Sequence, residues 1–500
     1  MTSLLILCCA VLVTAGDDAA IQVDSTKKLF LDDELIASIE NVKRQIHQVK
    51  KHEANPVLWP SEPWEGHTAV IYGSVLRDGD KYRMWYHGGA GVSYAESDDG
   101  IRWTKPPMDF VKLDGQPTNT MIRRGAGEGE PNAIPYFYEI FGVHKDERAT
   151  DPSMRYKMGF LSLDRQYKGP QGKRFHGGQR RGLGVAASED GIHWRLVDNW
   201  ATEAICDGAT HWLFDTAANK FILYGRTKYT APGLLDAWLT GSSLDGWVKR
   251  YFWGRAVARV ESPDFVNWNI TEPAEGPVVM MSDTEDKPGT EVYSMLVFPY
   301  ESVYIGLVQA FHNRPDECHL DIQLAVSRDS VKFTRVGDRA AFLPCGPVGS
   351  WDRFNNSLAN NPPIAAGDQL RIYYGGRTYR HSPYQGNDKG MPGGGIGFAT
   401  IPRDRFVSLS ASFDGGVVTT KPLVFQGKTL HLNAASRFGE IQVELLGAEG
   451  ETVAKSTPIR EDSLDIPVQW ADGSLGSAAG PLAAKITLKN AHLYALWCTD

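Results

Sequence analysis

The sequence predicts an all-β protein, and the main observation behind this prediction is one short pattern that recurs five times in the first four hundred residues. The clearest copies, YAESDDGIRW and VAASEDGIHW, occupy residues 94–103 and 185–194, and weaker copies begin at Val260, Leu324 and Gly395. In the clear copies a strand ends in Ser, an Asp-Gly turn follows, and the next segment carries Trp, which is typical of a β-hairpin. Repetition at this scale indicates one supersecondary unit that is used several times.

Further strands precede each hairpin. Segments rich in aromatic and β-branched residues lie directly upstream, and one more strand and turn come before each of them; the segments are residues 81–86, 155–160, 220–224, 303–308 and 369–374. Four short antiparallel strands per unit, repeated five times, predict a five-bladed β-propeller, in which radial repetition leaves only short sheet edges exposed. The alternative is a sandwich of unrelated β-meanders, and the recurrence of the turn residues in register argues against it.

The 500 residues divide into three predicted parts. Residues 1–16 form a signal peptide, because the apolar run from Leu4 to Val13 is too short to cross a bilayer and is followed by small residues. Residues 17–408 form the propeller, which is the expected catalytic domain. Residues 409–500 alternate in short runs between Gly-rich turns and predict a small C-terminal β-sandwich. We therefore expect an exported protein, periplasmic or secreted, with no membrane span.

Charge and cysteine content narrow the classes of function. The net charge of −8 and the pI near 5.9 do not supply the basic face that nucleic-acid binding requires. One basic cluster, between Lys168 and Arg181, is either a solvated hairpin or a loop that meets an anionic group on a ligand. Four cysteines follow the signal segment, and both disulfides and buried free thiols are compatible with them. No His/Cys cluster has zinc spacing, so no metal cofactor is expected, although a structural Ca²⁺ in the channel is compatible with the pattern.

Acidic residues near the starts of the innermost strands are the candidates for catalysis, because these strand ends converge at one mouth of a propeller channel. The candidate catalytic residues are Glu65, Asp151, Asp207 and Glu291. The candidate substrate-binding residues, aromatic or polar and placed near the same strand ends, are Trp64, His67, His211, Arg226, Tyr293, His312, Asp352, Arg377 and His381.

Several carboxyls sharing one mouth suit the cleavage of a glycosidic bond. One carboxyl must stay protonated to donate to the leaving oxygen, while another stays ionised as a nucleophile or as a base for water. We expect Asp151, Glu291 and at least one of Glu65 or Asp207 to lie within about one sugar ring of each other. Glu291, followed by Tyr293 and other apolar residues, is expected to be the proton donor.

These features resemble the five-bladed glycoside hydrolase superfamily, particularly families 32 and 43. The resemblance rests on the repeated units, on Thr150-Asp151-Pro152 before a strand, on segments such as Ile372-Tyr373-Tyr374-Gly375-Gly376 and on the C-terminal β-region. It implies a glycosidase that acts on an oligo- or polysaccharide, with Asp151 matching the Asp of the Arg-Asp-Pro step of family 32. The family's nucleophile motif finds no Asp in residues 63–67, and its Glu-Cys acid motif has only Cys206-Asp207 near the corresponding position.

Two other functions remain open at this point. A glycoside phosphorylase of the same fold would use one carboxylic acid and bind phosphate through Arg226, Arg377, His312 and His381, together with other basic residues. A non-catalytic carbohydrate-binding propeller would need the aromatic and polar groups but no paired acids. The sugar, the stereochemical outcome and the oligomeric state do not follow from the sequence.

Overall fold

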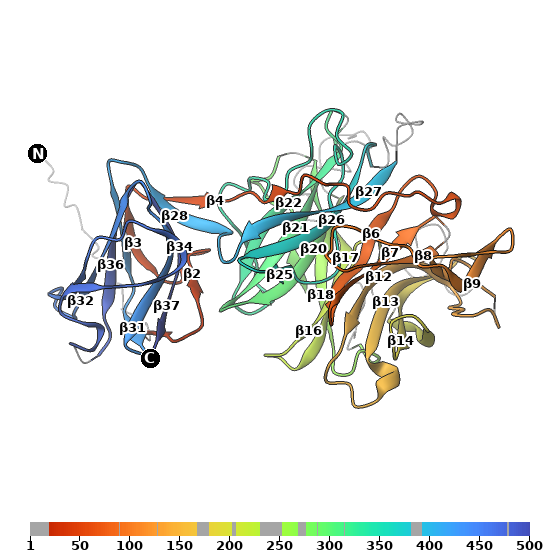
Figure 1. Ribbon diagram of the computed structural model, residues 1–500, viewed down its shortest axis with the longest axis horizontal. Coiled ribbons are helices and arrows are strands. Elements are labelled where there is room, and N and C mark those ends of the chain that lie inside the picture. The colour runs from red at the N-terminus through yellow and green to blue at the C-terminus, as the bar shows by residue number, and fades with distance from the viewer. Residues whose placement is uncertain are drawn as a thin grey trace, which may run out of the picture. The chain divides into compact units, whose positions relative to one another are not determined.

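The computed structural model describes residues 20–89, 91–127, 129–167, 180–202, 207–230, 253–268, 277–287, 289–314, 316–381, 393–477 and 480–500 (Figure 1). The chain forms two compact units, and β-strands make up most of both (Figure 1). The larger unit is Gln45–Val407, and the smaller unit combines residues up to Arg44 with Ser408–Asp500. The expected signal segment, residues 1–16, lies outside the described residues.

The described part of the larger unit contains five antiparallel sheets of four or five strands, here called sheets 1 to 5 in chain order, and one two-stranded hairpin. Sheet 1 is β6 (Val70–Asp78), β7 (Lys81–Gly88), β8 (Gly91–Ser97) and β11 (Thr120–Arg123). Sheet 2 is β12 (Phe137–Lys145), β13 (Tyr156–Asp164), β14 (Arg180–Ser188) and β15 (Arg195–Thr202). Sheet 3 is β16 (His211–Asp215), β17 (Lys220–Thr230), β18 (Trp253–Ser262) and β19 (Val278–Met280). Sheet 4 is β20 (Thr290–Tyr300), β21 (Val303–His312), β22 (His319–Ser327) and β23 (Thr334–Arg335).

Sheet 5 is completed by a strand from the beginning of the unit. Its strands are β24 (Ser357–Leu358) and β25 (Ile364–Ala366), which both pair with β26 (Gln369–Arg377), then β27 (Gly394–Pro402) and β5 (Lys50–Lys51). The hairpin β9 (Met108–Leu113) and β10 (Gln116–Thr118) and the 3₁₀ helices η1 (Pro63–Glu65) and η2 (Pro152–Met154) lie in the connections.

Neighbouring sheets contact one another through their first strands. β6 contacts β12, β12 contacts β16, and β16 contacts β20. β6 also contacts β26 and β27, so sheet 5 meets sheet 1. Sheets 1 to 4 therefore follow one another in chain order, Leu320 of sheet 4 bridges to Asn355 just ahead of β24, and sheet 5 returns to sheet 1.

The repeated sequence pattern forms the turn after the third strand of a sheet. The Ser97 and Ser188 hydroxyls each accept a hydrogen bond from the backbone N–H three residues later, at 2.9 Å. The fourth residue of each turn has a positive φ, from +62° to +76°, at Gly100, Gly191, Phe265 and Ser330. Glycine fits this left-handed conformation without a steric penalty, which explains the Asp-Gly step of the two clear copies.

These turns also join neighbouring sheets. The carbonyl of Gly191 in sheet 2 accepts from the Trp85 indole of sheet 1 at 2.9 Å. The carbonyl of Gly100 in sheet 1 accepts from the Tyr373 hydroxyl of sheet 5 at 2.8 Å, and Ser330 in sheet 4 accepts from Tyr224 of sheet 3 at 2.9 Å. Three of the turns thus make the same kind of contact between sheets.

The repeat predicts that the aromatic residue of each copy is buried, and two of the four are. Trp194 and Trp268 are buried. Trp103 is half-buried against Tyr373, with ring centroids 6.1 Å apart, and Phe333 packs edge-on against Tyr224 at the same separation. None of the four rings lies fully in solvent.

The smaller unit buries one apolar core between two sheets. One sheet contains β34 (Asp462–Pro467), β31 (Thr429–Ala435), β37 (Ala491–Thr499) and β28 (Val407–Ala411), with β2 (Lys28–Leu29) on β37. The other contains β3 (Ile36–Glu40), β29 (Gly416–Thr420), β36 (Ala483–Lys489), β32 (Glu440–Leu446), β33 (Thr452–Ser456) and β35 (Trp470–Asp472). β1 (Ile21–Val23) pairs in parallel with β30 (Leu423–Phe425); η5 is Leu475–Ser477, and β4 (Lys43–Ile46) leads into the larger unit.

The expected domain boundary at residue 17 is corrected by these pairings. Residues 20–44 do not belong to the larger unit, because β1, β2 and β3 pair with C-terminal strands. Pairing between strands that lie so far apart in sequence leaves no local signal. Among the described residues, no helix has the length and apolar character that crossing a membrane requires.

Candidate functional site

A group of charged and aromatic side chains gathers at the end of the larger unit where the first strands begin. Every sheet contributes to this group, here called the acid–arginine cluster: Tyr72 (β6), Glu139 (β12), Asp207 (before β16), Arg226 (β17), Tyr293 (β20) and Arg377 (β26). Each of these residues lies near the start of a first strand or near the end of the second strand that pairs with it. The strand direction therefore places all of them at one end of their sheets.

Gly208 allows the two acids of the cluster to approach each other. A Cβ at Gly208 would lie 2.8 Å from Oε2 of Glu139 and 3.0 Å from the Tyr72 ring, so the Glu139 carboxyl would have to shift to make room for it. Glycine at this position thus lets the backbone beside Asp207 pass close to the Glu139 carboxyl.

Asp207 is held as a carboxylate by Arg226. Nη1 of Arg226 lies 3.0 Å from Oδ2 of Asp207, and Nη1 of Arg181 lies 3.8 Å from Oδ1. Burial acts to raise the pKa of Asp207, but Arg226, the N–H of Gly208 and nearby arginines outweigh burial and lower the pKa below its usual value. The Asp207 side chain remains 37% exposed, so it is accessible to a ligand.

Glu139 has the opposite electrostatic environment. Burial and the negative charge of Asp207 raise the pKa of Glu139 from 4.5 to about 7, although Arg226, Arg377 and Arg124 act against the shift. Near neutral pH a large fraction of Glu139 therefore carries a proton while Asp207 does not. Two neighbouring carboxyls with opposite shifts are a recognised arrangement for an acid and a base in one site.

Arg226 is the structural centre of the cluster. Its Nε donates to the Tyr293 carbonyl at 3.1 Å, its Nη2 donates to the Gly208 carbonyl, and its guanidinium stacks 3.8 Å from the centre of the Tyr293 ring. The Tyr293 hydroxyl in turn lies 3.1 Å from Nε2 of His381. These contacts fix the guanidinium beside Asp207, so the carboxylate is positioned before any ligand binds.

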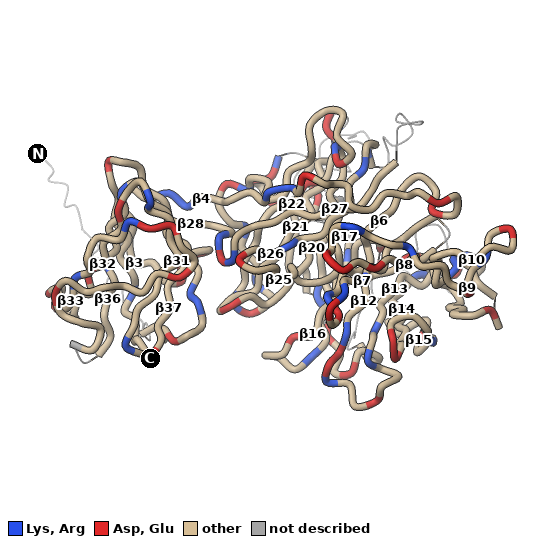
Figure 2. The backbone as a smooth tube through the Cα atoms, in the orientation of Figure 1, with Lys and Arg blue, Asp and Glu red and all other residues tan. Residues whose placement is uncertain are grey.

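More arginines surround the two acids. Arg124 donates to the Tyr138 carbonyl at 3.0 Å and contacts Nε2 of His87. Burial, Arg124 and Arg377 lower the pKa of His87 to about 3, so this imidazole is neutral. Basic and acidic residues are scattered over the described chain (Figure 2), and arginines are the cations that act on the charges of Glu139 and Asp207.

Five of the residues expected from the sequence meet in or beside this cluster. They are Asp207, Arg226, Tyr293, Arg377 and His381. Glu291 lies near them but is buried in an ion pair instead of the expected apolar surroundings. Its oxygens accept from the backbone N–H of Arg255 at 3.0 Å, from Nη1 of Arg255 at 2.7 Å and from Nδ2 of Asn313 at 2.6 Å. These donors occupy the carboxyl, so the expectation of an apolar proton donor at Glu291 is corrected.

The expected position of Asp151 is wrong. Asp151 is exposed and caps η2, where its carboxylate accepts from the Ser153 N–H at 2.9 Å. It lies in the connection from β12 to β13, beyond Lys145, whereas Glu139 lies near the start of β12. Six residues of extended strand separate Glu139 from Lys145, about 20 Å. Asp151 precedes the second strand of its sheet, and the start of a second strand lies at the opposite end from the cluster.

Glu65 and its neighbours hold the chain ahead of β6 in place. Glu65 is completely buried and accepts from Lys105 Nζ at 2.6 Å, from the backbone of Ser61 at 2.9 Å and from the Tyr86 hydroxyl. Trp64 donates to Asn119 at 2.7 Å. A carboxyl enclosed by so many donors is structural in this geometry.

The other expected residues have separate surroundings. His67 is exposed and its carbonyl accepts from Gly394 at 3.1 Å. His211 is buried, and burial lowers its pKa to about 4. The buried Asp352 carboxylate accepts from Lys51 Nζ at 2.5 Å and from the Tyr374 hydroxyl at 2.9 Å, and these contacts link β5 to β26 of sheet 5. His312 lies beside His319 and Asp321. Most of the basic segment between Lys168 and Arg181, and Cys206, lie outside the described residues.

Sequence analysis missed Glu139, Tyr72, His87 and Arg124. The available signal was weak but present: Glu139 is an acid inside a strand of aromatic and aliphatic residues, PYFYEIFGV, near the start of the first strand of its unit. A search of first strands alone, instead of all strands, would have found it.

No protein-family profile matches this chain. Two curated relatives, uncharacterized proteins Rv1502 and MT1551 of Mycobacterium tuberculosis, are 24% and 23% identical to it over 189 residues, which is 33% of this chain. The chain spans about half, 49%, of the length of these relatives.

Several solved structures are similar at low identity. One is described as a GH130-family protein from work on mannoside phosphorylases and glycoside hydrolases that target β-1,2-mannosidic linkages (14% identical, 75% of this chain and 97% of that chain, TM-score 0.45). A second is a family 43 arabinoxylan arabinofuranohydrolase of Bacillus subtilis (12% identical, 91% of this chain and 99% of that chain, TM-score 0.40). A third is BT0996 in an RGII complex (15% identical, 71% of this chain and 93% of that chain, TM-score 0.43).

Proposed function

We propose that the protein is a carbohydrate-active enzyme that hydrolyses a glycosidic bond, with Glu139 as the general acid and Asp207 as the base or nucleophile. The observation that carries this proposal is the pair of opposite pKa shifts on two neighbouring carboxyls. A glycosidase needs one carboxyl that is protonated and one that is ionised on the two sides of a single bond. Aromatic rings and arginines around the pair supply surfaces and donors for a sugar.

The proposed reaction begins with proton transfer from Glu139 to the oxygen that leaves the anomeric carbon. Asp207 then either removes a proton from the water that attacks this carbon or attacks the carbon itself. In the first case the products carry the proton from Glu139 and the hydroxide from water; Asp207 then releases to solvent the proton it took from water, and Glu139 takes one up. In the second case the ionised Glu139 removes a proton from water, which then breaks the glycosyl ester. Arg226 keeps Asp207 ionised in both routes.

The fold proposal follows from the order of the sheets. We propose that sheets 1 to 5 are the blades of a five-bladed β-propeller and that the smaller unit is a β-sandwich. The succession of first-strand contacts, the return of sheet 5 to sheet 1 and the completion of sheet 5 by β5 support the propeller. Two sheets around one core support the sandwich. Export, as the first sixteen residues predict, completes the proposal.

The test is a comparison of three variants on oligosaccharides and on aryl glycosides with good leaving groups, after a screen of plant and algal polysaccharides finds a substrate. Glu139→Gln is expected to lower turnover on oligosaccharides about 10²- to 10⁴-fold, because general acid catalysis contributes about this much. Activated aryl glycosides need little protonation, so the same variant should keep much more of its rate on them.

Asp207→Asn should be slow on both substrate types, whereas the matched control Asp151→Asn should match the wild type, since Asp151 is exposed at the other end of sheet 2. Equal losses for Glu139→Gln on both substrate types would remove Glu139 from the acid role. Sugar binding without turnover in the wild type would favour a carbohydrate-binding protein instead.

Phosphorolysis is the second candidate, and the arginines favour it. Arg124, Arg181, Arg226, Arg255 and Arg377 all act on the charge of Glu139 or Asp207, and arginine forks match phosphate geometry. A phosphorylase would release a sugar phosphate and would stop without inorganic phosphate. Turnover that is unchanged by removal of phosphate excludes it.

A further inference from the structure

A second group of side chains, separate in its contacts from Glu139 and Asp207, lies at the end of sheet 4. His312 is the last residue of β21, and His319 is the first residue of β22. The two strands pair antiparallel with His312 directly opposite His319, and Asp321 follows two residues after His319. Side chains two residues apart in a strand point to the same face, so register alone places all three side chains on one face.

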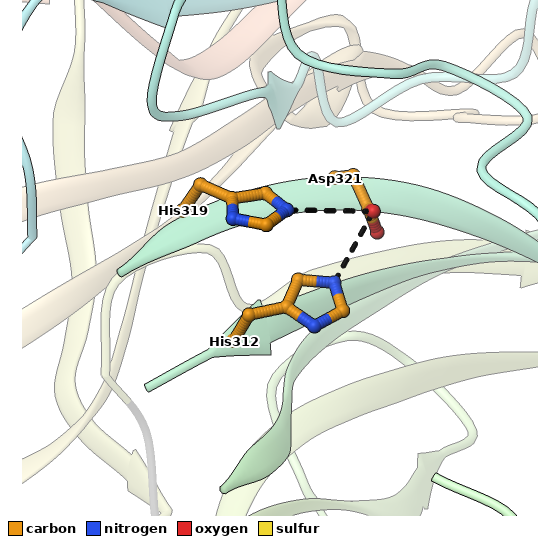
Figure 3. A group of neighbouring side chains, drawn as sticks. All are labelled: His312, His319 and Asp321. Carbon is orange, nitrogen blue, oxygen red and sulfur yellow. Dashed lines mark hydrogen bonds and ion pairs between the residues drawn. The ribbon is translucent and has the colours of Figure 1, made fainter. Parts of the chain in front are cut away.

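The three side chains converge at one point (Figure 3). One ligand atom from each of them lies within 4.8 Å of the other two. Nε2 of His312 is 3.2 Å from Oδ2 of Asp321, and Nε2 of His319 is 3.9 Å from the same oxygen (Figure 3). The imidazole rings stack with their centroids 4.4 Å apart.

These separations are close to those of a tetrahedral metal site. Metal–ligand bonds of about 2.1 Å in a tetrahedron place neighbouring ligand atoms about 3.4 Å apart. Small movements of the three side chains would bring their ligand atoms to these distances. Two imidazole nitrogens and one carboxylate oxygen are ligands that Zn²⁺ accepts, whereas Ca²⁺ and Mg²⁺ prefer oxygen ligands alone.

Two further features of these side chains point to a ligand at this place. Oδ1 of Asp321 is buried and accepts no hydrogen bond from the described part of the chain, and Asp321 is only 9% exposed. On the other side of the His312 ring, Nδ1 lies 4.0 Å from Oε2 of Glu317 and 3.4 Å from the Thr290 hydroxyl. Metal-binding histidines usually have such an oxygen at the second ring nitrogen, because it orients the ring and leaves the first nitrogen for the metal.

We propose that His312, His319 and Asp321 bind a zinc-type divalent transition metal ion, with water or a ligand oxygen in a fourth position. The bound metal would tie the end of β21 to the start of β22. It would also fix the adjacent Asn313, which donates to Glu291 at 2.6 Å. This inference differs from the sequence expectation of no metal site, because residues 312, 319 and 321 lack a zinc-finger spacing and meet only through strand register.

The experiment uses the full chain without a polyhistidine tag, because a tag would bind zinc itself. The protein is dialysed against a chelator, and Zn²⁺ is then titrated by calorimetry, with Ca²⁺ in a parallel titration. One equivalent of zinc should bind, and Co²⁺ should give the visible absorption of a low-coordinate site. His319→Ala and Asp321→Asn should each weaken zinc binding at least about a hundredfold.

The matched control is His431→Ala, because His431 also pairs with a carboxylate, Asp465 at 2.7 Å, but belongs to the smaller unit and lies outside the cluster. This variant should bind zinc like the wild type. Asp321→Asn is almost isosteric, so it carries the test if His319→Ala loses its far-UV dichroism.

Three results would overturn the proposal: no zinc binding by the wild type, a preference for Ca²⁺, or full zinc binding by His319→Ala/Asp321→Asn. None of these measurements depends on glycosidic cleavage, so the result does not depend on the function proposed for Glu139 and Asp207.

Discussion

The raised pKa of Glu139 has a consequence for stability that can be measured without any substrate. In the unfolded chain a glutamate titrates near 4.5, and in the folded protein burial and Asp207 raise this value to about 7. A raised value means that the folded state favours the neutral form. The stabilisation that this preference represents is complete below pH 4.5 and is lost as the pH rises through 7.

The magnitude follows from the size of the shift. At about 1.4 kcal/mol per pH unit, a shift from 4.5 to about 7 corresponds to about 3 kcal/mol between acidic and alkaline conditions. Glu139→Gln keeps the shape of the neutral side chain but cannot ionise. The variant should therefore be about as stable as the wild type at pH 4.5 and about 3 kcal/mol more stable at pH 8.

Thermal unfolding followed by circular dichroism at several pH values is a suitable assay. The larger unit spans Gln45–Val407, and an unfolding entropy of about 2 cal/mol/K per residue makes 3 kcal/mol equivalent to about 4 °C in Tm. Asp207→Asn is the informative control, because removing the negative charge should lower the pKa of Glu139 and flatten the pH dependence. A Tm difference between Glu139→Gln and wild type that does not change from pH 4.5 to pH 8 would refute the assigned electrostatics.

Two predictions concern the scaffold and need only unfolding experiments. Gly191→Ala should destabilise the protein by about 1–2 kcal/mol or more, because φ is +76° and the new Cβ would lie 3.0 Å from the Trp85 ring. Gly115 has a φ of +82° and open space around it, so Gly115→Ala should show only the cost of the left-handed backbone conformation. Lys51→Met should lower the free energy of unfolding by about 3 kcal/mol, because it leaves the buried Asp352 carboxylate without its cation and weakens the attachment of β5 to β27. An unchanged Tm would show that this ion pair does not hold β5 in sheet 5.

Much of the fold could be predicted because its repeating part depends on short stretches of neighbouring residues. The turns after Ser97 and Ser188 need a small polar residue, an aspartate and a left-handed residue in fixed order, and each requirement acts over a few neighbouring residues. The assignment of residues 20–44 failed for the opposite reason. β3 pairs with β29 almost four hundred residues away, and no local pattern records that pairing.

The candidate site was predicted less well, and the case of Asp207 shows why. Its place before a first strand was found from the sequence, but its role depends on Arg226 and Glu139, which come from two other strands. Burial, ion pairing and a neighbouring charge decide whether a carboxyl is an acid, a base or a structural anchor. Glu65, Glu291 and Asp207 look alike in sequence and differ in these surroundings, which arise only after the sheets assemble.

The two ends of the sheets explain both outcomes together. The recurring turns follow the third strands, which run in the same direction as the first strands, so the turns lie at the end opposite to Glu139 and Asp207. At the turn end, the turns of sheets 1, 2 and 4 each accept a hydrogen bond from an aromatic side chain of a neighbouring sheet, and similar residues are therefore required at these turns. At the other end each sheet supplies a different group to one shared site, so repetition there would be useless. The repeats located the strand ends, but they do not distinguish the two ends, so the sequence found Asp207 at the cluster and placed Asp151 at the wrong end, while Glu139 was missed.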